Sequence, residues 1–227
     1  MVRRLMLLLP LLLTALPAAA GSANFEGNAD LLVGWRGMRD DTAWGEYRDQ
    51  SAIALQADFG ERHFPLNAEV GVHFGVDSAR VAGRDVTSTT DELSLGAVWS
   101  PWKSRLLRPY LGAGGALVHA RVETVVAGDI VSDADETGAW YVHTGLIVSI
   151  GRHINVGGDV RMLRGGDLML FGGTADADYL QVTALAGYSW GKAAAPARVR
   201  REPRDARAMR NPVSRGPDRE GAAPVGF

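Results

Sequence analysis

The chain has 227 residues, of which 46% are hydrophobic and 22% charged, and its formal net charge is −2. This composition excludes a wholly disordered or collagen-like chain, and the charge balance excludes a strongly basic nucleic-acid-binding protein. The chain has no cysteine, which excludes disulfides, cysteine-ligated zinc and a cysteine nucleophile, and its 28 glycines exceed the ordinary share of about 7%.

The N-terminus has the pattern of an export signal. Two arginines near the start precede an apolar run over residues 5–18, which is too short for a spanning helix, and small residues follow it. This pattern predicts a signal peptide over residues 1–23. Cleavage is expected after Ala23, with Ala20 as the alternative site. The mature protein is then expected beyond the inner membrane of a bacterium.

Eight segments after residue 24 alternate apolar and polar residues with a period of two, which is typical of β-strands. In the clearest one, Val70 and Val72 alternate with Glu69, Gly71 and His73. Each segment has about the length of a tilted membrane-spanning strand, roughly 9–11 residues. The segments cover residues 28–38, 51–61, 66–77, 88–100, 109–124, 139–151, 154–164 and 178–190.

The connections between these segments alternate in length and in charge. The short connections are rich in basic residues and the long ones in acidic residues. This alternation predicts an all-β, eight-stranded antiparallel up-and-down transmembrane β-barrel over residues 24–191. Its long loops are expected outside the cell and its termini in the periplasm of a Gram-negative bacterium. The long connections are 39–50, 78–87, 125–138 and 165–177, and the short ones are 62–65, 101–108 and 152–153.

The two faces of the strands differ in bulk, and this difference favours a membrane barrel. The polar face is rich in glycine and the apolar face is bulky, as expected for a narrow polar interior and a lipid-facing exterior. A soluble lipocalin-like barrel would reverse the two faces. Aromatic residues near the segment ends predict two belts at the bilayer interfaces: Trp35, Phe59, Phe74, Trp99, Trp102, Tyr110, Trp140, Tyr188 and Trp190.

An eight-stranded barrel has an interior just wide enough for side chains, so we expect a filled lumen and no open pore. Charged residues on the polar faces must then pair with one another. The expected lumen charge network comprises Asp30, Arg36, Asp58, Glu69, Glu92, Arg121, Glu123, Asp159 and Arg161.

Three histidines, His73, His119 and His143, also fall on the expected inner faces and are weak candidates for metal ligands. A hairpin symmetric about residue 131 would place His119 opposite His143, with His73 at a similar height. No metal-binding spacing motif supports such a site. The sequence therefore assigns no metal, no cofactor and no catalytic residue.

The stretches 108–115 (RPYLGAGG) and 155–161 (NVGGDVR), together with the closing segment 178–190, resemble the small outer-membrane β-barrel domain family. This is the group of OmpA-type and OmpX-type eight-stranded barrels. The resemblance implies a monomer surrounded by outer-membrane lipid and lipopolysaccharide. If the barrel assembly machinery reads the last strand, Gly187, Tyr188 and Trp190 are the expected assembly signal.

The remaining segment, 192–227, is rich in alanine, proline and arginine, with nine Lys+Arg against four Asp+Glu. It predicts a disordered, basic periplasmic tail. Such a tail either contacts peptidoglycan or anionic lipid headgroups, or has no partner.

The expected function is structural or interactive: envelope integrity, or contact with an extracellular ligand or surface. Two alternatives remain open at this point. One is a lipid A-modifying barrel enzyme of the deacylase type, and the other is a soluble periplasmic lipocalin-like binding barrel.

Overall fold

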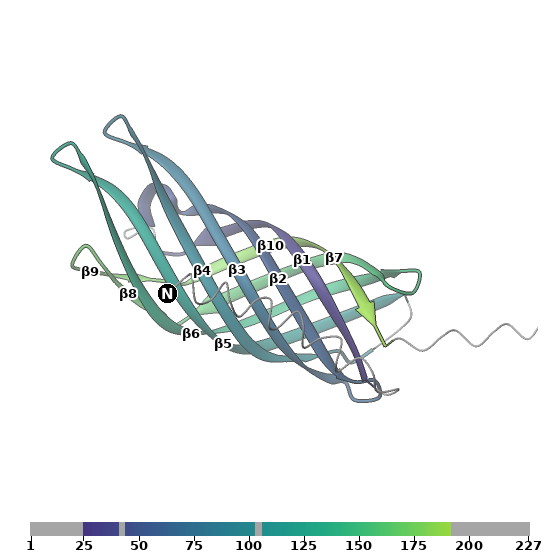
Figure 1. Cartoon of the computed structure of the whole chain (residues 1–227). Helices are drawn as coiled ribbons and strands as arrows, with labels where there is room; N and C mark the ends of the chain where they lie inside the picture. Colours follow the sequence, from purple (N-terminus) through teal and green to yellow (C-terminus); the bar gives the residue numbers. More distant parts are fainter. Residues whose placement is uncertain (1–24, 41–43, 103–105, 192–227) are drawn as a thin grey trace, which may run out of the picture. The chain divides into compact units, whose positions relative to one another are not determined.

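The structure is a computed structural model that describes residues 25–40, 44–102 and 106–191 (Figure 1). All its strands lie between Phe25 and Trp190. The expected signal peptide and tail lie outside the described residues. No helix among the described residues is long and apolar enough to cross a membrane. The elements are β1 (Phe25–Met38), η1 (Gly45–Tyr47), β2 (Asp49–Glu61), β3 (Leu66–Val81), β4 (Arg84–Trp99), β5 (Leu107–Val126), β6 (Asp129–Ile150), β7 (Ile154–Arg164), β8 (Asp167–Leu170), β9 (Gly173–Asp176) and β10 (Tyr179–Trp190).

Eight of these strands form a closed barrel in which every neighbouring pair is antiparallel. The predicted fold class is therefore confirmed. Sequential strands are neighbours, and β10 pairs with β1 to close the sheet. The ladder followed once around the barrel from Gly27 returns to β1 at Gly37, ten residues further along, as expected for strongly tilted strands. This path runs through Phe59, Ala68, Ala97, Ala113, Val142, Met162 and Leu180.

Strand alternation separates a buried polar interior from an exposed apolar exterior. In β3, Glu69 and His73 are fully buried, whereas Leu66 and Val76 on the other face are exposed. Successive side chains of a strand point to opposite faces, so the buried set faces the barrel interior. Seven of the eight segments have the two faces that their sequences predict.

Two of the expected long loops are strands for most of their length. The β3–β4 and β5–β6 hairpins continue through the ranges 78–87 and 125–138, and both project at one end of the barrel in Figure 1. Each ends in a two-residue turn, Ala82–Gly83 or Ala127–Gly128, in which both residues have positive φ. This is the turn whose twist matches that of the flanking strands. The expected loop 165–177 holds the separate β8–β9 hairpin.

We call the end at which the β3–β4 and β5–β6 hairpins project the loop end of the barrel. The opposite, turn end carries the β2–β3, β4–β5 and β6–β7 connections. Two apolar clusters fill the interior. The smaller one, nearer the turn end, contains Leu32, Ala54, Val98, Tyr110, Ile147 and Leu185. The larger one fills the loop end and joins Met38, Trp44, Tyr47, Val86, Ala116, Val118, Ala120, Val122, Tyr141, Leu163, Leu168, Leu170, Ala175, Ala177 and Tyr179.

Candidate functional site: the polar interior of the barrel

A polar network also occupies the interior, beside the two apolar clusters. Its members come from the inward positions of all eight barrel strands, and each expected network charge found there is at most 4% exposed. Burial at this level requires each charge to meet a partner. The expected network residues found in this interior are Asp30, Arg36, Asp58, Glu69, Glu92, Asp159 and Arg161.

Glu92 on β4 is the centre of the half of the network nearer the loop end. One carboxylate oxygen forms an ion pair with the guanidinium of Arg161. The other accepts a hydrogen bond from the hydroxyl of Tyr179. Arg36 Nη2 lies 3.8 Å from the same carboxylate, and Arg36 Nε and Nη2 both donate to Gln181 Oε1. The Arg36 guanidinium also covers the Tyr179 ring, at 4.1 Å from its centre.

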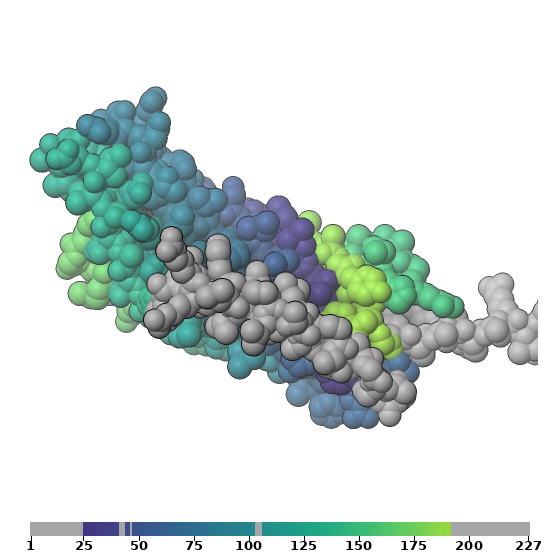
Figure 2. All heavy atoms as spheres, in the orientation of Figure 1, coloured from purple at the N-terminus to yellow at the C-terminus, as the bar shows by residue number. Residues whose placement is uncertain are grey.

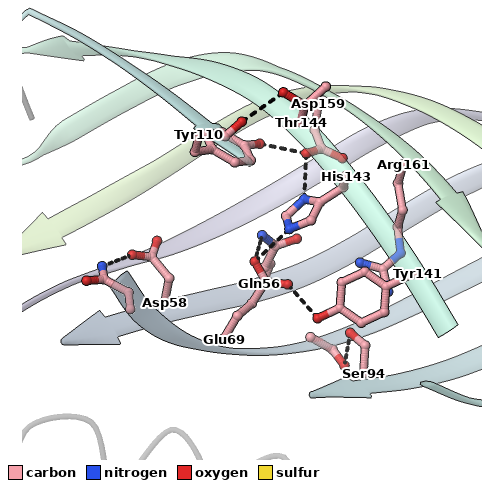
Figure 3. A network of polar contacts seen from close by, with 12 residues as sticks. Gln56, Asp58, Glu69, Ser94, Tyr110, Tyr141, His143, Thr144, Asp159 and Arg161 are labelled. Carbon is pink, nitrogen blue, oxygen red and sulfur yellow. Dashed lines mark hydrogen bonds and ion pairs between the residues drawn. The ribbon is translucent and has the colours of Figure 1, made fainter. Parts of the chain in front are cut away.

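His143 on β6 is the centre of a second group (Figure 3). Its Nδ1 lies 2.8 Å from Asp159 Oδ2 and its Nε2 lies 3.1 Å from Glu69 Oε2. The hydroxyl of Tyr110 donates to Asp159 at 2.7 Å, and that of Tyr141 donates to Glu69 at 2.9 Å. These contacts join strands β3, β5, β6 and β7 across the interior.

The two groups are linked by stacking. The Arg161 guanidinium lies over the Tyr141 ring, 3.6 Å from its centre, while Tyr141 donates to Glu69.

Glycines on the inner face make room for these large side chains. A β-carbon at Gly112 would overlap the His143 ring. The glycine-rich polar face of the sequence therefore reflects the space that buried rings and guanidinium groups occupy.

A third group surrounds Asp58 at the turn end. Its carboxylate accepts hydrogen bonds from Asn28 Nδ2 at 2.9 and 3.0 Å and from Asn67 Nδ2 at 2.6 Å. Arg108 Nη2 forms an ion pair with it at 3.3 Å. The described interior thus holds paired charges together with apolar clusters, which is an arrangement that fills a lumen.

No family model matches the chain, and no curated protein matches it either. Solved structures do. Neisserial surface protein A is 14% identical, over 75% of this chain and 98% of its own, with a TM-score of 0.50. Ail, the attachment invasion locus protein of Yersinia pestis, in complex with the heparin analogue sucrose octasulfate, is 11% identical over 74% and 99%, with a TM-score of 0.53. A major outer membrane protein from Thermus thermophilus is 10% identical over 73% and 99%, with a TM-score of 0.50.

These similarities agree with the closed antiparallel topology. The chain has the fold of the small outer-membrane barrels. The expected OmpA/OmpX-type architecture is confirmed. At these identities the likeness establishes the fold, and the chemistry of this outer-membrane-type barrel has to be argued from its own residues.

One strand of this outer-membrane-type barrel has the opposite facing from the one expected. In β5, Val118 and Ala120 point inward and are buried, whereas His119 and Arg121 point outward. Glu123 is also half-buried on the outward side, where its carboxylate accepts a hydrogen bond from the Thr87 amide. The assignment of Arg121 and Glu123 to the lumen network was therefore wrong. The reason is that the loop end has an apolar interior, so apolar residues there face inward.

The expected juxtaposition of two histidines was also wrong. The β5–β6 turn lies at residues 127–128, so His119 pairs with Glu136 and Asp91, and His143 pairs with Gly112 and Arg161. His119 Nδ1 lies 3.5 Å from Glu136 on the outer face. Among the described residues, no group of three His, Cys, Asp or Glu side chains could hold a metal ion.

One expected belt residue, Tyr110, is only 4% exposed and points into the interior, so its assignment to the belt was wrong. Tyr110 lies two residues before Gly112 on β5, so the two share the inward face. The sequence contains this signal, because glycine is typical of the inner face. Exposed rings toward the loop end are Trp35 and Trp140, and those toward the turn end are Trp99, Trp102 and Tyr188; Phe59, Phe74 and Trp190 are partly exposed.

The role of the buried tyrosines was not predicted from the sequence. Their hydroxyls donate hydrogen bonds to buried carboxylates: Tyr110 to Asp159, Tyr141 to Glu69 and Tyr179 to Glu92. A signal for two of them existed, because Tyr141 and Tyr179 share the parity of the polar residues His143 and Gln181.

Proposed function

We propose that this chain spans the outer membrane of a Gram-negative bacterium with its eight barrel strands, with the loop end outside and the termini in the periplasm. The exterior supports this proposal. Leu95 is 69% exposed, and outward positions of other barrel strands also carry exposed apolar residues, such as Ile53 and Leu146. An apolar exterior around a polar interior suits lipid and disfavours the soluble lipocalin-like barrel.

We infer further that the barrel is closed and acts as a scaffold for surface interaction and envelope integrity. The single observation that carries this inference is the filled interior, in which paired charges and two apolar clusters are buried together. A water-filled channel would need hydrated charges along its length. The site available for function is then the loop end, where binding residues of a rigid barrel are commonly placed.

Fractionation of the producing cells tests the location. The protein should be recovered with outer membranes, and its folded form should migrate differently on gels before and after boiling. Recovery in the soluble periplasm would refute the proposal. Reconstitution into planar bilayers tests closure, and we expect no steady conductance at neutral pH. A stable open channel would refute the closed lumen while leaving the location intact.

A further inference from the structure

The β8–β9 hairpin lies against the part of β6 that projects at the loop end, and its light green atoms adjoin the darker green ones of β6 in Figure 2. The Met169 amide donates to Asp135 Oδ2 at 2.7 Å, and the Phe171 amide donates to Asp133 Oδ2 at 2.6 Å. Leu168 and Leu170 point the other way and belong to the buried loop-end cluster. This arrangement leaves the side chains of Met169 and Phe171 facing outward, 58% and 48% exposed.

Phe171 has an unfavourable backbone conformation for its type. It forms the hairpin turn with Gly172, and its φ is +50°. Glycine and asparagine adopt this left-handed conformation readily, whereas a bulky aromatic residue is an outlier there. Neither the core nor the turn explains an exposed phenylalanine at this position. Strain of this kind is concentrated at ligand-binding and switch sites.

The charged residues of β8, β9 and the adjoining part of β6 are all acidic. The two described segments that build this surface, residues 129–139 and 167–176, contain no lysine or arginine. The backbone amides of Met169 and Glu136 donate to Asp135 and lower its pKa, so that carboxylate stays ionised. Arg121, on β5, donates to Ser132 instead. The acidic residues of the two segments are Asp129, Asp133, Asp135, Glu136, Asp167 and Asp176.

We propose that Met169 and Phe171, beside the carboxylates of Asp133 and Asp135, bind a segment of an extracellular polypeptide in which lysine or arginine residues alternate with aliphatic ones. The Phe171 ring would receive a cationic side chain over its face, and Met169 adapts to aliphatic groups of different shapes. The carboxylates attract the segment and repel polyanions such as the polysulfate bound to Ail. This proposal rests on the proposed function, because it needs the loop end outside the cell.

The test uses the full chain inserted into nanodiscs of neutral phosphatidylcholine. The probe is a fluorescent peptide of alternating arginine and leucine, and its counterpart has glutamate in place of arginine. We expect the arginine peptide to bind and the glutamate peptide to fail, with empty nanodiscs subtracted. The double variant M169T/F171N should weaken binding at least about tenfold. Asparagine suits the left-handed turn position, so this variant retains the hairpin.

Phe64→Asn is the matched control, because Phe64 is an exposed aromatic residue at the opposite, turn end. It should bind the arginine peptide like the unaltered chain. Equal binding by M169T/F171N, equal binding of both peptides, or no binding would each overturn the proposal. Insertion is measured separately by heat-dependent gel migration. A chain that inserts but does not discriminate between the peptides refutes this proposal alone, and a chain that never inserts refutes the proposed function as well.

Discussion

Glu92 is a fully buried carboxylate that faces two guanidinium groups, Arg36 from β1 and Arg161 from β7. Desolvation makes such a group costly unless its partners remain in place. The same residue type has a different weight on the outer face of the loop end. Arg121 is exposed there and donates to the hydroxyl of Ser132. The environment, and not the residue type, decides what each arginine contributes.

Replacing Arg161 by methionine should therefore destabilise the barrel strongly. The change keeps most of the aliphatic stem and removes the charge, which leaves Glu92 short of a partner. We expect a loss of about 3–5 kcal/mol in the free energy of unfolding. Urea titration of the refolded chain in detergent micelles measures it. Arg121→Met is the control and should change stability by less than about 0.5 kcal/mol. Equal effects of the two substitutions would show that the interior is hydrated.

At the scale of strands, the alternation of apolar and polar residues located all eight barrel strands. It could not fix which face is which along the whole of β5. Leu111 and Leu117 share the parity of the residues expected to face inward but point outward, whereas Val118 and Ala120 were expected to face outward and point inward. The physical reason is a change of surroundings along one strand. Between the two aromatic belts, in what we call the apolar band, the exterior of the barrel is apolar. At the loop end the interior is apolar and the exterior is polar.

The positions of the hairpin turns could not be predicted from the sequence either. Ala82–Gly83, Ala127–Gly128 and Phe171–Gly172 each end a hairpin with two positive φ values. Only the glycine of each pair is an evident turn residue, so these ranges were expected to be loops.

For the interior, seven charged residues could be named from strand parity alone. Their partners could not, because pairing depends on the register between strands far apart in the sequence.

The β8–β9 hairpin should loosen at low pH. The pKa of Asp135 is lowered because the amides of Met169 and Glu136 donate to its carboxylate. A lowered pKa means that this contact stabilises the folded hairpin above the ordinary aspartate value of about 3.9 and is lost as the pH falls through the lowered value. Amide hydrogen exchange measures this. Protection of the Met169 amide should fall with pH relative to that of Val182 in the barrel, and Asp135→Asn should abolish the difference.

For the whole molecule, the exposed apolar exterior decides which solvent the barrel requires. Leu95 lies four residues from the expected belt residue Trp99, well inside the apolar band, whereas Ile150 ends β6 beside the β6–β7 turn. Arginine at these two positions tests whether hydrocarbon surrounds the barrel.

Leu95→Arg should cost roughly 2–4 kcal/mol and Ile150→Arg roughly 0–1 kcal/mol, because headgroups and water solvate a guanidinium near the interface. The free energy of unfolding in lipid vesicles measures both changes. A barrel that folds without lipid or detergent and suffers equally from the two substitutions would contradict a membrane location.

The basic tail should be dispensable for insertion. The last strand, β10, ends at Trp190 and closes the barrel with β1, and the segment 192–227 lies outside the described residues. A chain lacking residues 196–227 should still reach the outer-membrane fraction in its heat-modifiable form. Loss of insertion would place part of the assembly signal in the tail rather than at Gly187, Tyr188 and Trp190.

The pairing of β1 with β10 also governs how the molecule can form. Their register runs from Gly27–Trp190 to Met38–Tyr179, so the first strand made by the ribosome finds its second neighbour only when the last strand has emerged. Contacts of such high sequence separation make folding slow. Throughout that delay the β1 edge stays unpaired and open to aggregation. A polypeptide of this topology therefore has to be kept from collapsing until synthesis is complete, and its ring closes last.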